Sequence, residues 1–297
     1  MTAVAAAPRP RRVAAATAPG RTRESRATRM GLGLAAWAVG LLFALPLLWM
    51  VLTSFHSETD AASPTPQVFA PLTLEGYRSF FGESSGASPW PSLINSLWAA
   101  GVSTVLVVAL AVPAAYALSV RPVRKWSDVM FFFLSTKFLP AVAGLMPLYL
   151  IAGRLRILDN IWFLLIIYAA MNLPIAVWML RSFLVDIPPA LFEAAALDGA
   201  GLMMTLRRVI MPIISPGVAA TALICFIFAW NEMLFARVLT GVTAGTAPVY
   251  LTGFVTSQGQ FLAQVCAAAT VVSLPVLIAG FAAQDKLVQG LSMGAVK

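Results

Sequence analysis

Six long apolar segments decide what this 297-residue chain can fold into. They cover residues 31–54, 93–120, 129–153, 160–180, 209–234 and 261–283. A helix of about 20 apolar residues crosses the hydrocarbon core of a bilayer, where no water satisfies an exposed backbone group. The chain is 60% hydrophobic and only 11% charged, which excludes a water-soluble protein. The segment 238–260 is uncharged but rich in Gly, Thr and Ser, so we expect an external loop there. The pattern predicts an all-α polytopic membrane protein with six transmembrane helices.

The positive charges indicate the orientation of these segments, because Lys and Arg are retained on the cytoplasmic side. With the N-terminus inside, fifteen of the 20 Lys and Arg residues fall on inner segments and four on outer ones, while Lys137 lies within the third apolar segment. One short outer segment, residues 154–160, does not fit this orientation well, because it contains Arg154 and Arg156 beside Asp159. The net charge of +8 does not indicate a nucleic-acid partner, since the cations flank the apolar segments. We expect a multi-pass protein of the cytoplasmic membrane with both termini in the cytoplasm.

The two ends of the chain lie outside the apolar segments. Residues 1–30 are rich in Arg, Ala and Pro and contain a single acid, so we expect a disordered basic cytoplasmic tail that anionic lipid attracts. The apolar run that follows is longer than that of a signal peptide, which predicts a retained anchor, with a transit peptide as the minor alternative. Residues 284–297 are expected to form a cytoplasmic C-terminal tail.

The segment between the first two spans, residues 55–92, is rich in Pro, Gly and Ser and is expected outside the membrane. Within it, residues 72–81 predict a short helix. Phe80, Phe81 and Trp90 are expected at the level of the lipid headgroups, where aromatic rings have a structural role.

Prolines and polar side chains interrupt the spans. Each of the six contains at least one proline, which removes a backbone donor and is typical of kinked, bundled helices. Lys137 in the third span, and Asn231 and Glu232 near the outer end of the fifth, are candidates for a translocation path, because an intramembrane charge usually faces a cavity. The alternatives are that Lys137 reaches the interface or pairs with another subunit. For Glu232, close to the outer surface, a structural role is favoured.

The sequence contains no catalytic constellation. No Lys follows a Gly as a phosphate-binding loop requires, and no pair of intramembrane carboxylates is present to relay protons. The single His56 has no Cys nearby, and Cys225 and Cys266 lie in apolar stretches that form neither a metal motif nor a disulfide framework. We therefore expect no catalytic residue, metal or cofactor in this chain. If ATP drives it, another polypeptide binds the nucleotide.

The segment between the fourth and fifth spans is the most informative part of the sequence. Asp186 can cap a helix and Pro188 and Pro189 suit its first turn, so a helix should begin there. It should end near Gly199. The three alanines at 194–196 leave this helix little side-chain bulk, which allows close approach to a partner. The segment predicts a rigid helix-turn-helix that protrudes into the cytosol.

This segment resembles the cytoplasmic motif of the membrane permease subunits of binding-protein-dependent ABC importers. That motif is Glu-Ala-Ala, three residues, Gly, about nine further residues and an Ile-x-Leu-Pro-like ending. Glu193-Ala194-Ala195 matches its start, Gly199 follows at the expected spacing, and Ile210-Met211-Pro212 matches its end. Met211 stands where Leu is usual and Leu206 where an aromatic residue is common, and both departures keep the apolar character.

The resemblance covers nearly all of the chain after residue 30. Trp230-Asn231-Glu232 and the C-terminal segment are similar to the carbohydrate-importer branch, the six-span subunit of maltose-type systems. It implies a six-span transmembrane domain over residues 31–283 with a cytoplasmic coupling helix. It also implies contacts with a separate ATPase through the loop around residues 186–212, made by Glu193, Ala194, Ala195, Asp198, Gly199, Ile210 and Pro212. Contacts of the C-terminal tail with the same partner are implied for Gln284, Gly290, Gly294 and Lys297.

By this resemblance the chain is the permease subunit of an ATP-driven importer of a sugar or related solute, and not itself an enzyme. ATP and magnesium belong to the partner ATPase. The other implied partners are a second permease subunit, a second copy of the ATPase, an extracytoplasmic solute-binding protein and membrane lipid. An ion-coupled secondary transporter stays open as an alternative, although the repeated halves and midplane ion sites of such proteins are not found in this sequence. An integral-membrane enzyme would need a reactive cluster that the sequence does not offer.

Overall fold

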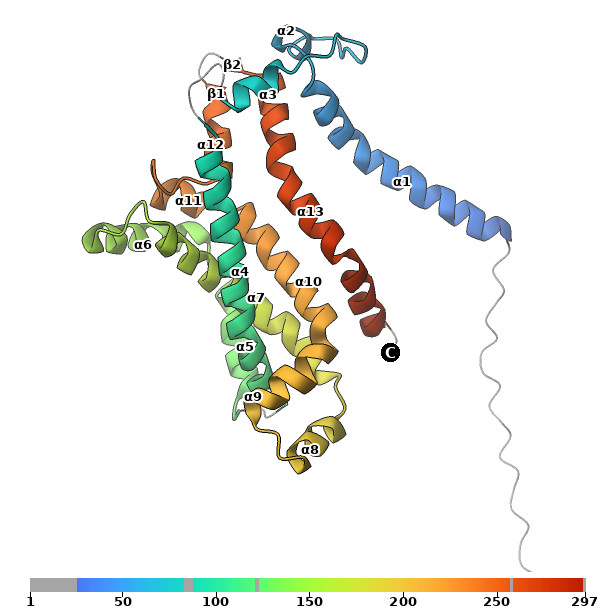
Figure 1. The fold of residues 1–297 in the computed structure, drawn as a ribbon, viewed down its shortest axis with the longest axis vertical. Coiled ribbons are helices and arrows are strands. Elements are labelled where there is room, and N and C mark those ends of the chain that lie inside the picture. Colours follow the sequence, from blue (N-terminus) through green and yellow to red (C-terminus); the bar gives the residue numbers. More distant parts are fainter. Residues whose placement is uncertain (1–25, 83–87, 121–122, 257–258, 296–297) are drawn as a thin grey trace, which may run out of the picture. The chain divides into compact units, whose positions relative to one another are not determined.

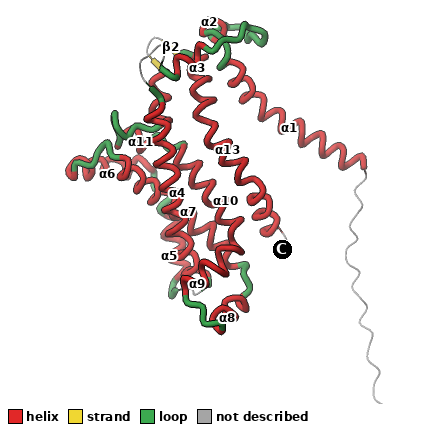
Figure 2. Tube along the Cα trace, viewed as in Figure 1, coloured by secondary structure: helices red, strands yellow, loops and turns green. Residues whose placement is uncertain are grey.

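The computed structural model describes residues 26–82, 88–120, 123–256 and 259–295. The expected tail up to residue 25 and the terminal Lys297 lie outside this part of the chain. The chain divides into two units, Met1–Trp49 and Met50–Lys297, which are described separately. The described residues are mostly helical, with a single pair of two-residue strands among them (Figure 2). The predicted all-α class is confirmed.

Helix α1 (Arg26–Thr53) begins in the first unit and holds Pro46 in its interior. The elements of the second unit follow in chain order. They are α2 (Glu58–Ala61), α3 (Glu75–Phe80), α4 (Trp90–Ser119), α5 (Trp126–Ser135), α6 (Ala141–Leu155), α7 (Ile161–Val185), α8 (Pro189–Leu197), α9 (Leu202–Met204), the π-helix η1 (Thr205–Ile210), α10 (Met211–Trp230), α11 (Leu234–Leu239), α12 (Ala247–Leu251), the 3₁₀-helix η2 (Thr252–Phe254), β1 (Val255–Thr256), β2 (Gly259–Gln260) and α13 (Leu262–Ala295).

Five of the described helical stretches are long and apolar enough to cross a membrane. They are Met30–Thr53, Trp90–Ser119, Ile161–Val185, Leu202–Trp230 and Leu262–Lys286. Each lies at the position of one expected span. The chain is therefore a polytopic membrane protein, with shorter apolar helices at the remaining position.

The third expected span forms two helices instead of one. Helix α5 ends at Ser135 and α6 begins at Ala141. Pro140, at the N-cap of α6, has no backbone N–H to donate and disfavours a helical conformation at the residue before it. The Ser135 and Thr136 hydroxyls donate to the carbonyl oxygens of Phe132 and Phe133, which gives these carbonyls partners where the helix stops. Lys137 lies in the connection between the two helices.

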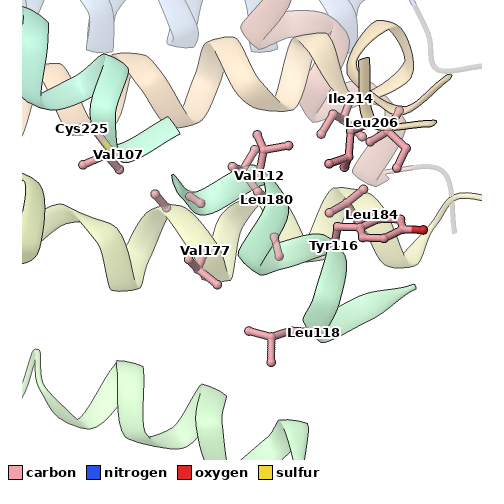
Figure 3. Packing of buried hydrophobic residues seen from close by; sticks show 14 of the residues in the cluster. Val107, Val112, Tyr116, Leu118, Val177, Leu180, Leu184, Leu206, Ile214 and Cys225 are labelled. Atoms are coloured by element: carbon pink, nitrogen blue, oxygen red, sulfur yellow. The ribbon is translucent and has the colours of Figure 1, made fainter. Parts of the chain in front are cut away.

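Helices α4, α7, α10 and α13 form the body of the second unit (Figure 1). Helix α4 packs along α7, and α10 contacts α4, α7 and α13. One buried apolar cluster lies toward α8 and includes Val107, Leu180 and Ile214 (Figure 3). A second cluster, toward α3, includes Tyr168 and Trp230, whose Nε1 donates to the Val272 carbonyl oxygen at 3.1 Å.

The predicted short helix at residues 72–81 is confirmed by α3. Its Phe80 is not at an interface, however, because its side chain is fully buried between the rings of Tyr250 and Phe254. Phe81 and Trp90 are exposed and their ring centroids lie 5.7 Å apart. The expected interfacial position is wrong for Phe80, because α3 packs against the 247–254 segment.

A carboxylate from α2 caps the last helix. The two Oε atoms of Glu58 accept hydrogen bonds from the backbone N–H groups of Ala263 and Gln264, at 3.1 and 2.9 Å. These N–H groups belong to the first turn of α13, which has no partner for them within the helix. The N-terminal end of α13 is thus held by a residue far away in the sequence.

A second carboxylate organises the loop that follows α11. Asp159 accepts hydrogen bonds from the N–H groups of Gly241, Thr243 and Ala244, at 2.7 to 2.9 Å. Burial alone would raise the pKa of the Asp159 carboxyl, but these three hydrogen bonds outweigh it and hold that pKa below its usual value. The loop is therefore tied to the connection between α6 and α7.

Candidate functional site: an exposed helical lobe and a polar cavity

Residues 186–212 form the first candidate region, which we call the α8 lobe. It lies at one end of the bundle between α7 and α10 (Figure 1). Helix α8 ends as predicted: Gly199 has φ +74°, and the N–H of Ala200 donates to the Ala195 carbonyl oxygen at 2.9 Å. This arrangement is a Schellman motif, in which glycine supplies the left-handed residue after the helix. The sharp bend into α9 follows from it.

The start of α8 differs from the prediction. Asp186 ends α7 as its C-cap residue and does not cap α8. The N-cap of α8 is Pro188, which offers no side-chain acceptor. Because Pro189 occupies the first helical position, one of the backbone donors that a cap would satisfy is absent. The helix therefore begins at the predicted place without the predicted cap.

Most of the predicted coupling residues lie on the surface of this lobe. Glu193, Ala194, Asp198 and Gly199 are exposed, and so is Pro212.

The other two residues predicted for coupling are internal. Ala195 is buried and Ile210 is fully buried in the apolar cluster near α8. In this chain Ile210 supports the lobe from inside.

Two apolar residues that the sequence reasoning missed are also prominent on the lobe. Leu197 is 90% exposed and lies outside the long apolar helical stretches. Met203 is 74% exposed and lies at the start of one of them. Exposed apolar side chains beside the carboxylates of Glu193 and Asp198 are typical of a surface that contacts a protein partner.

The lobe is joined to the bundle by packed side chains. The rings of Tyr116 in α4 and Phe192 in α8 meet edge to face at 6.2 Å. Leu206 of η1 packs in the same cluster as Tyr116 (Figure 3). A cavity of about 550 Å³ lies between α4, α8 and η1, with Glu193 and Thr205 in its lining. A short π-helix such as η1 is uncommon and often marks a functional position in a helix.

The second candidate region is a cavity of about 330 Å³ between the third apolar segment, α7 and α10, which we call the Lys137 cavity. Its lining consists of Lys137, Tyr168, Met171, Asn172, Ile227, Phe228, Ala229, Asn231 and Glu232. The three residues predicted for a translocation path therefore line one cavity. Asn172 was missed, because a neutral amide within an apolar run gives no charge signal.

The hydrogen bonds of this cavity separate its polar residues by role. Glu232 accepts from the N–H groups of Phe235 and Ala236 at 3.0 and 3.1 Å, which caps α11. This is the structural role favoured for it from the sequence. Asn231 donates from Nδ2 to the Ile227 carbonyl oxygen at 2.9 Å.

The residues predicted for the C-terminal contact fall at the end of the chain. Gln284 is exposed on α13, and Gly290 and Gly294 fall within the same helix, which continues to Ala295.

A bundle of long apolar helices with a small-residue lobe at one end and a polar cavity inside defines a membrane transport subunit. The family model of the binding-protein-dependent transport system inner membrane component matches residues 107–293. The chain belongs to this family and is a permease subunit of an ABC importer, located in the inner membrane. It is a non-catalytic transport subunit. Its family works with an ATPase, which binds the ATP, and with a solute-binding protein.

Relatives agree with this assignment over nearly the whole chain. The chain is 40% identical to the probable ABC transporter permease protein y4oR of Sinorhizobium fredii, over 92% of this chain and 98% of that protein. It is 32% identical to the trehalose transport system permease protein SugB of Mycobacterium tuberculosis, over 85% and 92% of the two chains. The chain is thus related to the permeases of sugar ABC transporters.

A solved structure has the same fold. It is that of a bacterial ABC transporter involved in the import of the acidic polysaccharide alginate, matched with a TM-score of 0.70 over 89% of this chain and 98% of that chain, at 24% identity. The family match decides against the ion-coupled secondary transporter and the integral-membrane enzyme that the sequence had left as alternatives.

Proposed function

We propose that this permease imports a sugar or related solute and that a separate ATPase drives the transport through contacts with the α8 lobe. The observation that carries the proposal is the surface of that lobe, where the small Ala194, the apolar Leu197 and two carboxylates are exposed together. Relatives named for trehalose support a carbohydrate as the solute. A polyol or a phosphorylated solute fits the same architecture.

The complete importer contains a second permease subunit, two copies of the ATPase and an extracytoplasmic solute-binding protein, all working in a lipid bilayer. Both termini and the α8 lobe lie in the cytoplasm, as the distribution of Lys and Arg supports. Residues 284–297 form a second contact with the ATPase.

The mechanism is alternating access, with the energy supplied by ATPase subunits outside the membrane. ATP draws the two ATPases together, and the docked lobes move with them. Movement of α8 reaches α4 through the contact of Phe192 with Tyr116, and reaches α10 through η1. Such coupling requires that the ATPase contact the lobe differently in the two states of the permease, because a ligand shifts only an equilibrium between states that it binds unequally.

The coupling proposal is tested by two substitutions that alter only the exposed surface, Leu197→Asp and Ala194→Trp. Reconstituted with its partners, each variant should insert normally but lose transport-coupled ATPase activity by about tenfold or more, the effect of losing roughly 1.4 kcal/mol of docking energy. The matched control is Val242→Asp, because Val242 is fully exposed in the loop tied to Asp159. Normal coupling in both lobe variants would contradict the proposal.

The orientation is tested separately with cysteine reporters in a chain lacking Cys225 and Cys266. A membrane-impermeant maleimide should label Leu197→Cys only from the cytoplasmic side and Val242→Cys only from the outside. Labelling of position 197 from the outside would reverse the proposed orientation.

A further inference from the structure

The Lys137 cavity contains a positive charge without a partner. In the part of the chain that the structure describes, the Lys137 side chain makes no hydrogen bond and no ion pair. Lysine has three donors and no acceptor, so this group can bind only an acceptor or an anion. A charge at this position in an apolar segment is unfavourable unless something compensates it.

The one carboxylate in the lining does not pair directly with Lys137. Both oxygens of Glu232 accept hydrogen bonds from the first turn of α11, at 3.0 and 3.1 Å. The backbone carbonyl oxygen of Glu232 accepts from the Tyr168 hydroxyl at 3.3 Å. The carboxylate keeps its negative charge, but both of its oxygens are occupied by backbone donors and, within the described residues, it forms no ion pair with Lys137.

A second polar group in the lining also lacks a partner. Asn172 in α7 is only 4% exposed, and its side chain makes no hydrogen bond within the described residues. Its amide atoms are not fully enclosed, so they face the cavity, where water or a solute group can pair with them. Its NH₂ group can donate to the same kind of acceptor as Lys137, while Met171 and Phe228 give the cavity an apolar wall.

We propose that the Lys137 cavity selects an anionic group of the transported solute, a carboxylate, sulfonate or phosphate carried by a sugar or polyol. Lys137 supplies the opposite charge, Asn172 donates a hydrogen bond, and the apolar wall contacts the carbon skeleton. This inference rests on the proposed function and on the prediction that Lys137, Asn231 and Glu232 lie on the translocation path. It narrows the solute from sugars in general to acidic ones.

The charge preference of the cavity is measured with a reporter cysteine that leaves its polar groups intact. Phe228→Cys is suitable, because Phe228 lines the cavity and is 49% exposed. The assay uses the assembled importer in membrane vesicles, in a background lacking Cys225 and Cys266. Its probes are two methanethiosulfonates of similar size, one with an ethylsulfonate group and one with an ethyltrimethylammonium group.

With Lys137 present, the sulfonate reagent should react faster relative to the ammonium reagent than it does after Lys137→Gln. The ratio of the two rates should fall by about fivefold in that variant, the order expected for one charge acting on two opposite probes across a hydrated cavity. Lys137→Arg should keep the ratio. At the remote reporter Val242→Cys, Lys137→Gln should leave it unchanged.

Protection gives a second measurement. Sodium glucuronate should slow labelling at position 228 more than glucose at the same concentration and ionic strength, and Lys137→Gln should abolish the difference. Asn172→Leu should weaken the protection by glucuronate and leave the ratio of the two reagents nearly unchanged, since it removes a donor and no charge.

The outcomes separate this inference from the function on which it rests. If both reagents label position 228 but Lys137→Gln leaves their ratio and the protection unchanged, the charge is neutralised by another subunit and the inference is wrong, while the path stands. If neither reagent labels position 228 in any nucleotide state, the cavity is closed to water and both the path and the inference fail.

Discussion

Gly217 in α10 lies directly against the ring of Phe183 in α7, so close that a Cβ atom at 217 would overlap the ring. Phe183 packs against the buried apolar cluster that lies toward the α8 lobe. The contact of the two helices at this point depends on the absence of one side chain.

Gly217→Ala should therefore destabilise the permease. The overlap forces Phe183 to move at a cost of about 1–3 kcal/mol, which exceeds the gain of up to about 1 kcal/mol from replacing a helical glycine. Thermal unfolding in detergent measures the effect. In a Phe183→Ala background the same substitution should be neutral or stabilising. The matched control is Gly280→Ala, where no atom lies within 4 Å of the added Cβ, and which should not destabilise.

Gly199 tests the geometry of the α8 lobe. No atom lies within 4 Å of a Cβ at this position, so a substitution acts through the backbone alone. Gly199→Asn should preserve transport-coupled ATPase activity, because asparagine tolerates the left-handed conformation at φ +74°. Gly199→Val should unwind the last turn of α8, at a cost of about 1–2 kcal/mol or more, and lower that activity without preventing insertion. Equal activity of the two variants would show that the bend is not needed for coupling.

Glu58 tests the cap of the last helix. Glu58→Ala removes both acceptors of the Ala263 and Gln264 N–H groups and should cost about 1 kcal/mol, the usual value of a helix cap. Hydrogen exchange at these two amides should accelerate, while amides deeper in α13 remain protected. Glu75→Ala, at an exposed carboxylate of the neighbouring α3, is the control. Unchanged exchange at residues 263 and 264 would mean that water replaces the cap without loss.

Asp159 makes the loop after α11 sensitive to acid. The pKa of its carboxyl is lower in the folded protein than in the unfolded chain, where it is about 4. Its contribution to stability is therefore complete above that value and is lost as the pH falls through the folded pKa. Protection of the Gly241, Thr243 and Ala244 amides, corrected for intrinsic exchange, should decrease in that range. Asp159→Asn should show low protection at all pH values, and a pH dependence that survives this substitution would point to another group.

The elements that the sequence predicted well are those governed by local rules. The long apolar runs gave the positions of the long helices, because a membrane-spanning helix needs only length and apolar composition. The end of α8 at Gly199 followed from the requirement of one left-handed residue, which glycine meets most easily.

The features that the sequence did not reveal depend on contacts between distant segments. Phe80 is buried because Tyr250 and Phe254 meet it, and the partner of Glu58 is a helix that begins at Leu262. Neither contact can be predicted from the composition of the local sequence. A role for Asn172 could be recognised only in the fold, where α7 and α10 place it in the same lining as Lys137. Pro140 indicated a break in the third span, but the apolar residues on both sides of it favoured the prediction of one continuous helix.

The interruption between α5 and α6 restricts what this part of the chain can face in the assembled importer. The Lys137 ammonium group and the first N–H groups of α6, which receive no side-chain cap, need polar partners, and hydrocarbon offers them none. Acyl chains are therefore unsuitable neighbours for residues 136–140. We therefore expect water or polar groups of an adjoining subunit beside this turn in the assembled importer.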